Sequence, residues 1–170
     1  MKKIIFILGL LITISFGATL EEAKIAYAKG DYQTALTILE DLALKNDASV
    51  QNDLGVMYDT GKGVKQDYFK AKEWYEKSAA QGNASAQYNL GVLYDYGYGV
   101  KQDYFKAKEW YEKSAAQGYA SAQYNLGIMY ANGYGPKQDK RVAKQWFGKA
   151  CDGGNQNGCY NYKILNQQGY

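Results

Sequence analysis

The sequence contains no histidine, which removes the commonest general base, the usual pH switch and the commonest metal ligand. A Ser–His–Asp triad is therefore excluded, and no metal or cofactor site is expected. There is one proline but 19 glycines, a balance that favours helices separated by glycine-based turns. The formal net charge is only +3, and two of the positive charges, Lys2 and Lys3, lie near the N-terminus. No basic surface dominates, so nucleic acid is not an expected partner.

Residues 1–18, MKKIIFILGLLITISFGA, have the pattern of a secretory signal peptide. Lys2 and Lys3 form a positive start, an apolar run follows from Ile4 to Phe16, and small residues suited to cleavage come next. The alternative is an uncleaved membrane anchor, but the apolar run is shorter than the roughly 20 residues that span a bilayer. We therefore expect a periplasmic or secreted protein without stable membrane insertion after cleavage.

A 36-residue repeat dominates the rest of the chain. The segment VKQDYFKAKEWYEKSAAQG occurs at 64–82 and again, letter for letter, at 100–118. A period between about 20 and 50 residues is typical of stacked repeats. The pattern predicts a first helical unit at 19–47, three longer repeats at 48–83, 84–119 and 120–155, and a capping helix at 156–170.

Each longer repeat reads as two helices joined by a Gly-x-Gly loop. The loop ends at an aspartate suited to N-cap the second helix, and these aspartates are Asp67, Asp103 and Asp139. On the second helix, small and aromatic residues from Ala71 to Ala79 fall on one face, and we expect Glu73 to pair with Lys77. Gly91 lies inside a first helix, where glycine costs about 1 kcal/mol relative to alanine. It therefore predicts close helix packing.

The repeat resembles the Sel-1-like family. The pattern A-x-A-Q-x-x-L-G-x-x-Y-x-x-G-x-G-V-x-x-D-x-x-K-A-x-x-W-Y is carried best by residues 84–118, and A-Y-A-K-G-D-Y-x-x-A-L in 19–47 resembles a tetratricopeptide repeat. The resemblance implies an all-α fold, a right-handed α-solenoid of antiparallel helix pairs with a concave binding face. Its members mostly act as adaptors, so a protein or peptide partner is expected. Asn89 and Asn125, on first helices, are candidate contacts on that face.

The two cysteines, Cys151 and Cys159, bracket a predicted helix–helix turn. In an exported protein this arrangement favours a disulfide, and the alternative is two free thiols in a reducing compartment. The segment K-A-C-D-x-x-x-x-x-G-C also resembles the cysteine-rich Sel-1-like proteins of the Helicobacter and Campylobacter group, some of which are described as slow β-lactamases. A β-lactamase is therefore the alternative function. However, no serine begins an S-x-x-K motif, and S-D-N and K-T-G are absent.

Tyrosine is abundant, with 18 residues, and three of them lie in the glycine loops: Tyr96, Tyr98 and Tyr134. Aromatic side chains with a polar tip are favoured at protein contacts, so these are candidate partner-binding residues. The alternative is that each forms a lid that stabilises its own loop. The sequence as a whole favours an exported, non-enzymatic scaffold that binds a protein or peptide. A purely structural envelope component also remains open.

Overall fold

A computed structural model describes residues 18–170, and this part of the chain is entirely helical apart from turns and loops. The signal-peptide prediction falls almost wholly on residues 1–17, outside the described residues. The helices are α1 (Leu20–Ala28), α2 (Tyr32–Ala43), α3 (Ala48–Thr60), α4 (Tyr68–Ala80), α5 (Ala84–Tyr96), α6 (Tyr104–Ala116), α7 (Ala120–Asn132), α8 (Lys140–Asp152) and α9 (Gln156–Gln167).

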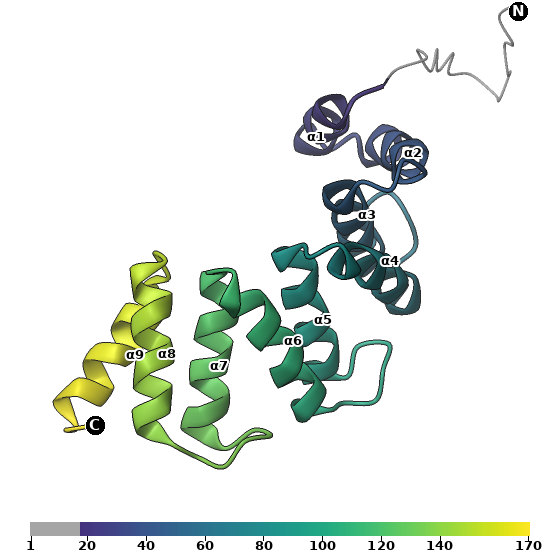
Figure 1. The fold of residues 1–170 in the computed structure, drawn as a ribbon. Helices are drawn as coiled ribbons and strands as arrows, with labels where there is room; N and C mark the ends of the chain where they lie inside the picture. Colours follow the sequence, from purple (N-terminus) through teal and green to yellow (C-terminus); the bar gives the residue numbers. More distant parts are fainter. Residues whose placement is uncertain (1–17) are drawn as a thin grey trace, which may run out of the picture.

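The helices form successive antiparallel pairs in a curved array that runs from α1 at one end to α9 at the other (Figure 1). We call α1, α3, α5, α7 and α9 the first helices, and α2, α4, α6 and α8 the second helices. The prediction of an all-α solenoid of antiparallel helix pairs is confirmed. None of the helices from residue 18 onward combines the length and the hydropathy that a membrane crossing needs.

The predicted signals at the helix ends operate as expected. The Asp67 side chain accepts hydrogen bonds from the backbone N–H groups of Phe69 (3.0 Å) and Lys70 (3.1 Å), and Asp103 repeats the arrangement. The first helices α3, α5 and α7 end at glycines in the left-handed region, where a side chain would be strained. These ends are set by local sequence, which is why the pattern located them.

A helical glycine lies flat against an aromatic ring in each longer repeat. A Cβ atom on Gly91 would lie 2.5 Å from the Tyr111 ring, and Gly55 and Gly127 make the same approach to Tyr75 and Phe147. The rings are fully or almost fully buried. The close packing expected of Gly91 is confirmed, and it explains why a poor helix former occupies the middle of α5.

The ion pair on the second helix α4 differs from the one expected from the sequence. The ion pair on α4 joins Lys72 to Glu76, whereas Lys77 lies over the Trp74 ring with its Nζ 4.0 Å from the ring centre. The expected Glu73–Lys77 pair is therefore wrong. A lysine and a tryptophan three positions apart share one side of a helix, and the half-buried ring offers the ammonium a closer partner than the exposed carboxylate does.

A buried tyrosine–aspartate hydrogen bond recurs in the first two longer repeats and is absent from the third. The Tyr111 hydroxyl donates to Asp95 Oδ2 at 3.1 Å, and Tyr75 donates to Asp59 at 3.0 Å. Burial raises the pKa of the Asp95 carboxyl, and the bond from Tyr111 opposes that shift. In the third repeat both partners change together, to Phe147 and Ala131. Replacing both leaves no buried polar atom without a partner.

The paired change to Phe147 and Ala131 predicts that the stability effects of substituting Tyr111 and Asp95 are strongly coupled. Tyr111→Phe should lower the free energy of unfolding by about 1.5 kcal/mol or more, because the half-buried carboxylate loses its donor. Asp95→Ala alone should also destabilise the protein, since the Tyr111 hydroxyl is then buried without its acceptor. The double variant reproduces the Phe147/Ala131 pair and should be less destabilised than the sum of the single changes by about 1–2 kcal/mol. Urea denaturation of the four proteins measures this cycle, and additive effects would contradict it.

Candidate functional site

The first helices share a surface on which asparagine or aspartate recurs every 36 residues. We define the first-helix face by Asp53, Asn89, Asn125 and Asn161, which lie on α3, α5, α7 and α9. All four side chains are half-buried. They therefore present polar atoms to solvent from a packed surface, and two of them, Asn89 and Asn125, are the first-helix residues expected from the sequence.

Side-chain hydrogen bonds connect this face from one repeat to the next. Asn89 donates from Nδ2 to Asn52 Oδ1 at 3.1 Å, and Asn52 donates to Asp53 Oδ1 at 3.4 Å. These two hydrogen bonds orient the amide groups. The oxygens that do not take part in them can accept a hydrogen bond from another donor. An ordered row of donors and acceptors is suited to the N–H and C=O groups of an extended peptide.

A tyrosine cluster lies beside Asn125, between α5 and α7. The Tyr88 ring packs on Tyr119 at 5.3 Å and on Tyr111 at 5.8 Å between ring centres. Burial raises the pKa of the Tyr88 hydroxyl, and a hydrogen bond with Asn125 opposes the shift. The Tyr88 hydroxyl therefore stays protonated at neutral pH. The Tyr111 hydroxyl is buried and already donates to Asp95.

Tyr119 itself breaks the capping pattern of the molecule. It occupies the N-cap position of α7 and makes no capping hydrogen bond, whereas the N-cap side chain of every other described helix accepts one. The matching residue one repeat earlier is Asn83, which caps α5 through Ala86 N–H at 3.0 Å. Sequence reasoning missed Tyr119, although its departure from the capping pattern was a visible signal.

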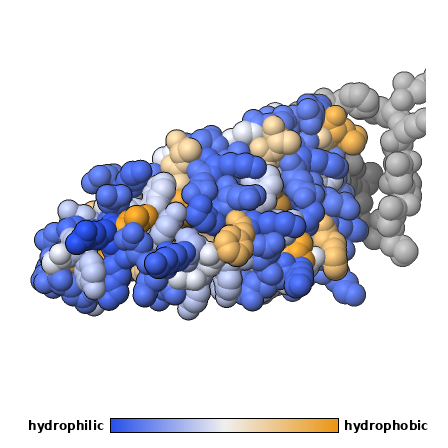
Figure 2. Space-filling view, turned by 60° about the horizontal axis from the view of Figure 1, so that its bottom comes forward, coloured by the Kyte–Doolittle hydropathy of each residue, from blue (hydrophilic) through white to orange (hydrophobic). Residues whose placement is uncertain are grey.

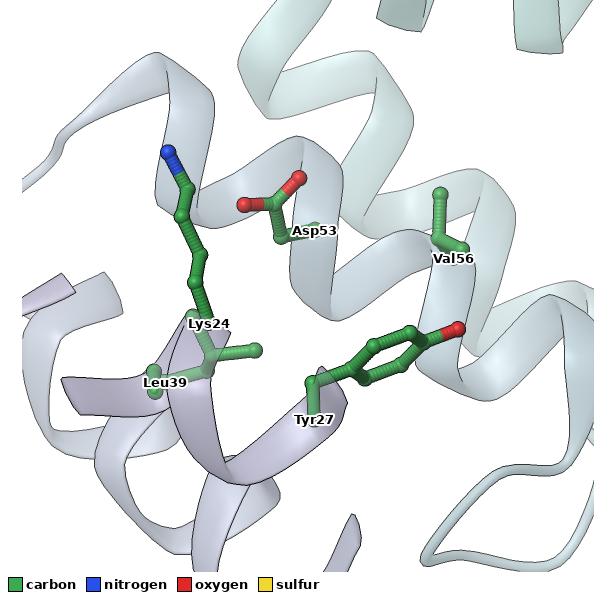
Figure 3. Close-up of a pocket in the computed structure, with 6 residues that line it drawn as sticks. Lys24, Tyr27, Leu39, Asp53 and Val56 are labelled. Carbon is green, nitrogen blue, oxygen red and sulfur yellow. The ribbon is translucent and has the colours of Figure 1, made fainter. Parts of the chain in front are cut away.

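At the N-terminal end the face opens into a cavity of about 380 Å³, which we call the N-terminal pocket. It lies between α1, α2 and α3 and is lined by Ala23, Lys24, Tyr27, Leu39, Asp53 and Val56. In Figure 3 Lys24 and Asp53 stand beside one another, and the Tyr27 ring reaches toward Val56. Burial raises the pKa of the Asp53 carboxyl, while Asn52 and Lys24 oppose the shift.

Two of the three tyrosines expected in the loops link neighbouring repeats, whereas Tyr96 is the last residue of α5 rather than a loop residue. Tyr98 stacks on Tyr68 of the preceding repeat at 5.1 Å between ring centres, and Tyr134 stacks on Tyr104 at 5.3 Å. Tyr96 stacks only on Tyr98 and is 62% exposed, against 41% for Tyr98 and 45% for Tyr134. Tyr96 is thus the most accessible of the three. Figure 2 shows that on the visible face the hydrophobic side chains form separate islands within a hydrophilic surface.

The serines of the repeated helices have structural roles. Ser78 Oγ donates to the Ala48 carbonyl at 2.6 Å, and Ser114 Oγ donates to the Ala84 carbonyl at 2.7 Å. Both serines are fully buried. A buried hydroxyl committed to a backbone carbonyl lacks both the access and the activating base that a nucleophile needs. Among residues 18–170 no group of histidine, cysteine, aspartate or glutamate is arranged to hold a metal ion.

The predicted disulfide is present: Cys151 is bonded to Cys159, with their Cα atoms 4.5 Å apart. It joins the end of α8 to the start of α9. The bond clamps α9 to α8, the helix on which α9 mainly packs.

The comparisons with known proteins agree with this architecture. The family model described as the Sel1 repeat matches residues 48–83, 84–119 and 120–155. A Sel1 repeat protein from Oxalobacter formigenes is 34% identical with a TM-score of 0.84, over 89% of this chain and 62% of that one. A protective antigen of uropathogenic Escherichia coli with an SLR fold is 32% identical with a TM-score of 0.78, over 88% of this chain and 34% of that one.

The chain thus spans less than two thirds of both of those structures. Helicobacter pylori cysteine rich protein B shares the fold at 21% identity, with a TM-score of 0.57 over 85% of this chain and 98% of that one. No curated protein matches the chain. The three matched repeats cover more than half of the sequence, and they coincide with the helix pairs α3–α4, α5–α6 and α7–α8. The chain belongs to the Sel1 repeat family.

Proposed function

We propose that the protein is an exported scaffold that binds an extended peptide segment of a partner protein along its first-helix face. The observation that carries the proposal is Tyr119. A capping side chain in its place, as at Asn83, contributes about 0.5–2 kcal/mol to helix stability. The chain instead has a half-exposed aromatic residue that packs on Tyr88 beside Asn125. An aromatic contact thus replaces a capping hydrogen bond, and local rules of this kind are broken most often at functional sites.

The surroundings of Tyr119 suit a peptide. Aromatic rings with hydroxyl groups supply apolar area and hydrogen bonds at low entropic cost, and the row of Asn and Asp side chains supplies donors and acceptors for a peptide backbone. The exposed ring of Tyr96 and the exposed parts of Tyr98 and Tyr134 would extend the peptide contact from the first-helix face onto the loops. The pattern of residues 1–18 and the Cys151–Cys159 disulfide support export. No observation favours β-lactam hydrolysis.

Tyr119→Asn separates binding from stability. The variant restores the cap used at Asn83 and loses the packing on Tyr88, and because these two contributions are of similar size the thermal midpoint should change little. Linear peptides selected from a random display library on the wild-type protein should bind the variant at least about tenfold more weakly, as expected for an aromatic residue at the centre of an interface. Titration calorimetry with the selected peptides measures the affinity.

Phe105→Asn is the matched control. Phe105 is an aromatic residue on the second helix α6 and is 67% exposed. Its replacement should leave the affinity of the same peptides unchanged. Peptides that bind the Tyr119→Asn variant as tightly as the wild type would contradict the proposed function.

A further inference from the structure

Helix α1, which lines the N-terminal pocket, buries only small side chains, whereas the other longer first helices also bury large ones. The buried residues of α1 are Ala23 and Ala26, whereas α5 buries Leu90 and Leu93. Helices α3 and α7 each bury a leucine and a methionine at the same spacing. Interiors are otherwise close-packed, and small buried side chains on α1 are compatible with the open space that Lys24 and Asp53 line.

The walls of the pocket are apolar and held in place. Ala23, Leu39 and Val56 line it with aliphatic carbon, and Tyr27 supplies an aromatic wall. The Tyr27 hydroxyl accepts a hydrogen bond from Lys62 Nζ at 3.0 Å, and its ring packs edge-on against Tyr32 at 5.1 Å. The cavity is therefore formed before any ligand arrives, which lowers the entropic cost of binding.

The mouth of the pocket presents one donor and one acceptor. The ion pairs among residues 18–170 are Lys72–Glu76 and Lys108–Glu112, so Lys24 and Asp53 are not joined to each other. Asp53 has one oxygen hydrogen-bonded to Asn52 and a second one available. Together, the Lys24 ammonium and the Asp53 carboxylate match the C=O and N–H groups of a single peptide residue.

We infer that the N-terminal pocket holds one large apolar side chain, aromatic or aliphatic, of the peptide that the proposed function places on the first-helix face. The backbone N–H of that residue donates to Asp53 and its C=O accepts from Lys24. Asp53 belongs both to the pocket and to the row of Asn and Asp side chains, and the Asn89–Asn52–Asp53 hydrogen bonds connect the two. The pocket thereby sets the register and the side-chain preference of the bound peptide.

The inference rests on the proposed function but is tested at the pocket itself. N-acetyl-L-tryptophan methylamide carries one side chain between two amides, and N-acetylglycine methylamide is its counterpart without a side chain. The tryptophan compound should shift the backbone amide signals of Ala23, Leu39 and Val56 in the ¹⁵N-labelled full chain. The glycine compound should leave these signals in place at equal concentration. Equal shifts, or no shift with either compound, would overturn the inference.

Ala23→Leu fills the pocket from α1, and Val56→Phe fills it from α3 should the first variant fold poorly. Either change should abolish the tryptophan-induced shifts while helical circular dichroism is retained. Lys24→Met and Asp53→Leu should each weaken binding about two- to fivefold, the range of a single exposed charged contact. Unchanged binding in the filled variants would overturn the inference. Shifts that vary with protein concentration in the absence of compound would instead assign the pocket to a second copy of the chain, and would overturn it as well.

The library-selected peptides test the proposed function and the pocket inference separately. If these peptides need Tyr119 but bind the Ala23→Leu variant normally, the pocket inference fails and the proposed function stands. If the tryptophan compound binds the pocket while no peptide depends on Tyr119, the proposed function fails and the pocket remains a site for an apolar side chain. Enrichment of large apolar residues at one position, lost when the selection is repeated on Ala23→Leu, is the result we expect.

Discussion

Gly91→Ala should lower the free energy of unfolding by about 1–3 kcal/mol, although alanine is the better helix former. The added Cβ would lie 2.5 Å from two carbons of the Tyr111 ring, a distance that real contacts do not reach. The ring cannot move aside readily, because it is fully buried and its hydroxyl is bonded to Asp95. Either α5 shifts away from α6 or the ring leaves its position, and both changes cost packing energy. Urea denaturation measures the loss.

Gly148→Ala is the matched control for this substitution. Gly148 is also helical, but an added Cβ there would lie 3.3 Å from Tyr162, whose side chain is 40% exposed and free to move. The gain in helix propensity should then prevail, and the variant should be unchanged or up to about 1 kcal/mol more stable. Opposite signs for the two substitutions are expected. The same sign for both would show that the approach to Tyr111 does not govern stability.

Loss of the Cys151–Cys159 disulfide should destabilise the C-terminal end by roughly 2–3 kcal/mol, the chain-entropy value for a loop of this length. The expected loss is local, because each repeat contacts only its neighbours. In Cys151→Ala/Cys159→Ser, hydrogen exchange should accelerate in α8 and α9 and remain unchanged in α3 and α4. Wild-type protein treated with a thiol reductant should behave like the double variant. Uniform acceleration along the chain would contradict this expectation.

The third longer repeat has fewer side-chain hydrogen bonds between its helices than the middle repeat has. The middle repeat has a Ser114 bond to the Ala84 carbonyl and a Gln117 bond to Gln87 at 2.8 Å, besides the Tyr111–Asp95 bond. The third repeat has Ala150, Gly153 and Phe147 at the corresponding donor positions. It therefore lacks all three bonds, and the Gln123 Oε1 atom is buried without a partner. The covalent link stabilises the next junction, where it fixes α9 against α8.

The sequence by itself determined the features that depend on local or periodic information. Aspartates and glycines at fixed positions set the helix ends, and the 36-residue period set the stacking unit. Gly91, inside a helix, predicted that a neighbouring helix packs closely against it. The cysteine spacing predicted the bond between α8 and α9. Each of these follows from residues near one another in the chain or from the repeat itself, so no knowledge of how the repeats sit together was needed.

Only the tertiary structure decided what neighbouring repeats do to one another. The loop residues Tyr98 and Tyr134 face a tyrosine of the preceding repeat, and Tyr119 gives up a capping position to pack on Tyr88. The N-terminal pocket is lined by residues of α1, α2 and α3, so it forms only once these three helices come together. Such contacts join residues that are distant in sequence, and their geometry is fixed by the stacking angle between helix pairs rather than by any local pattern.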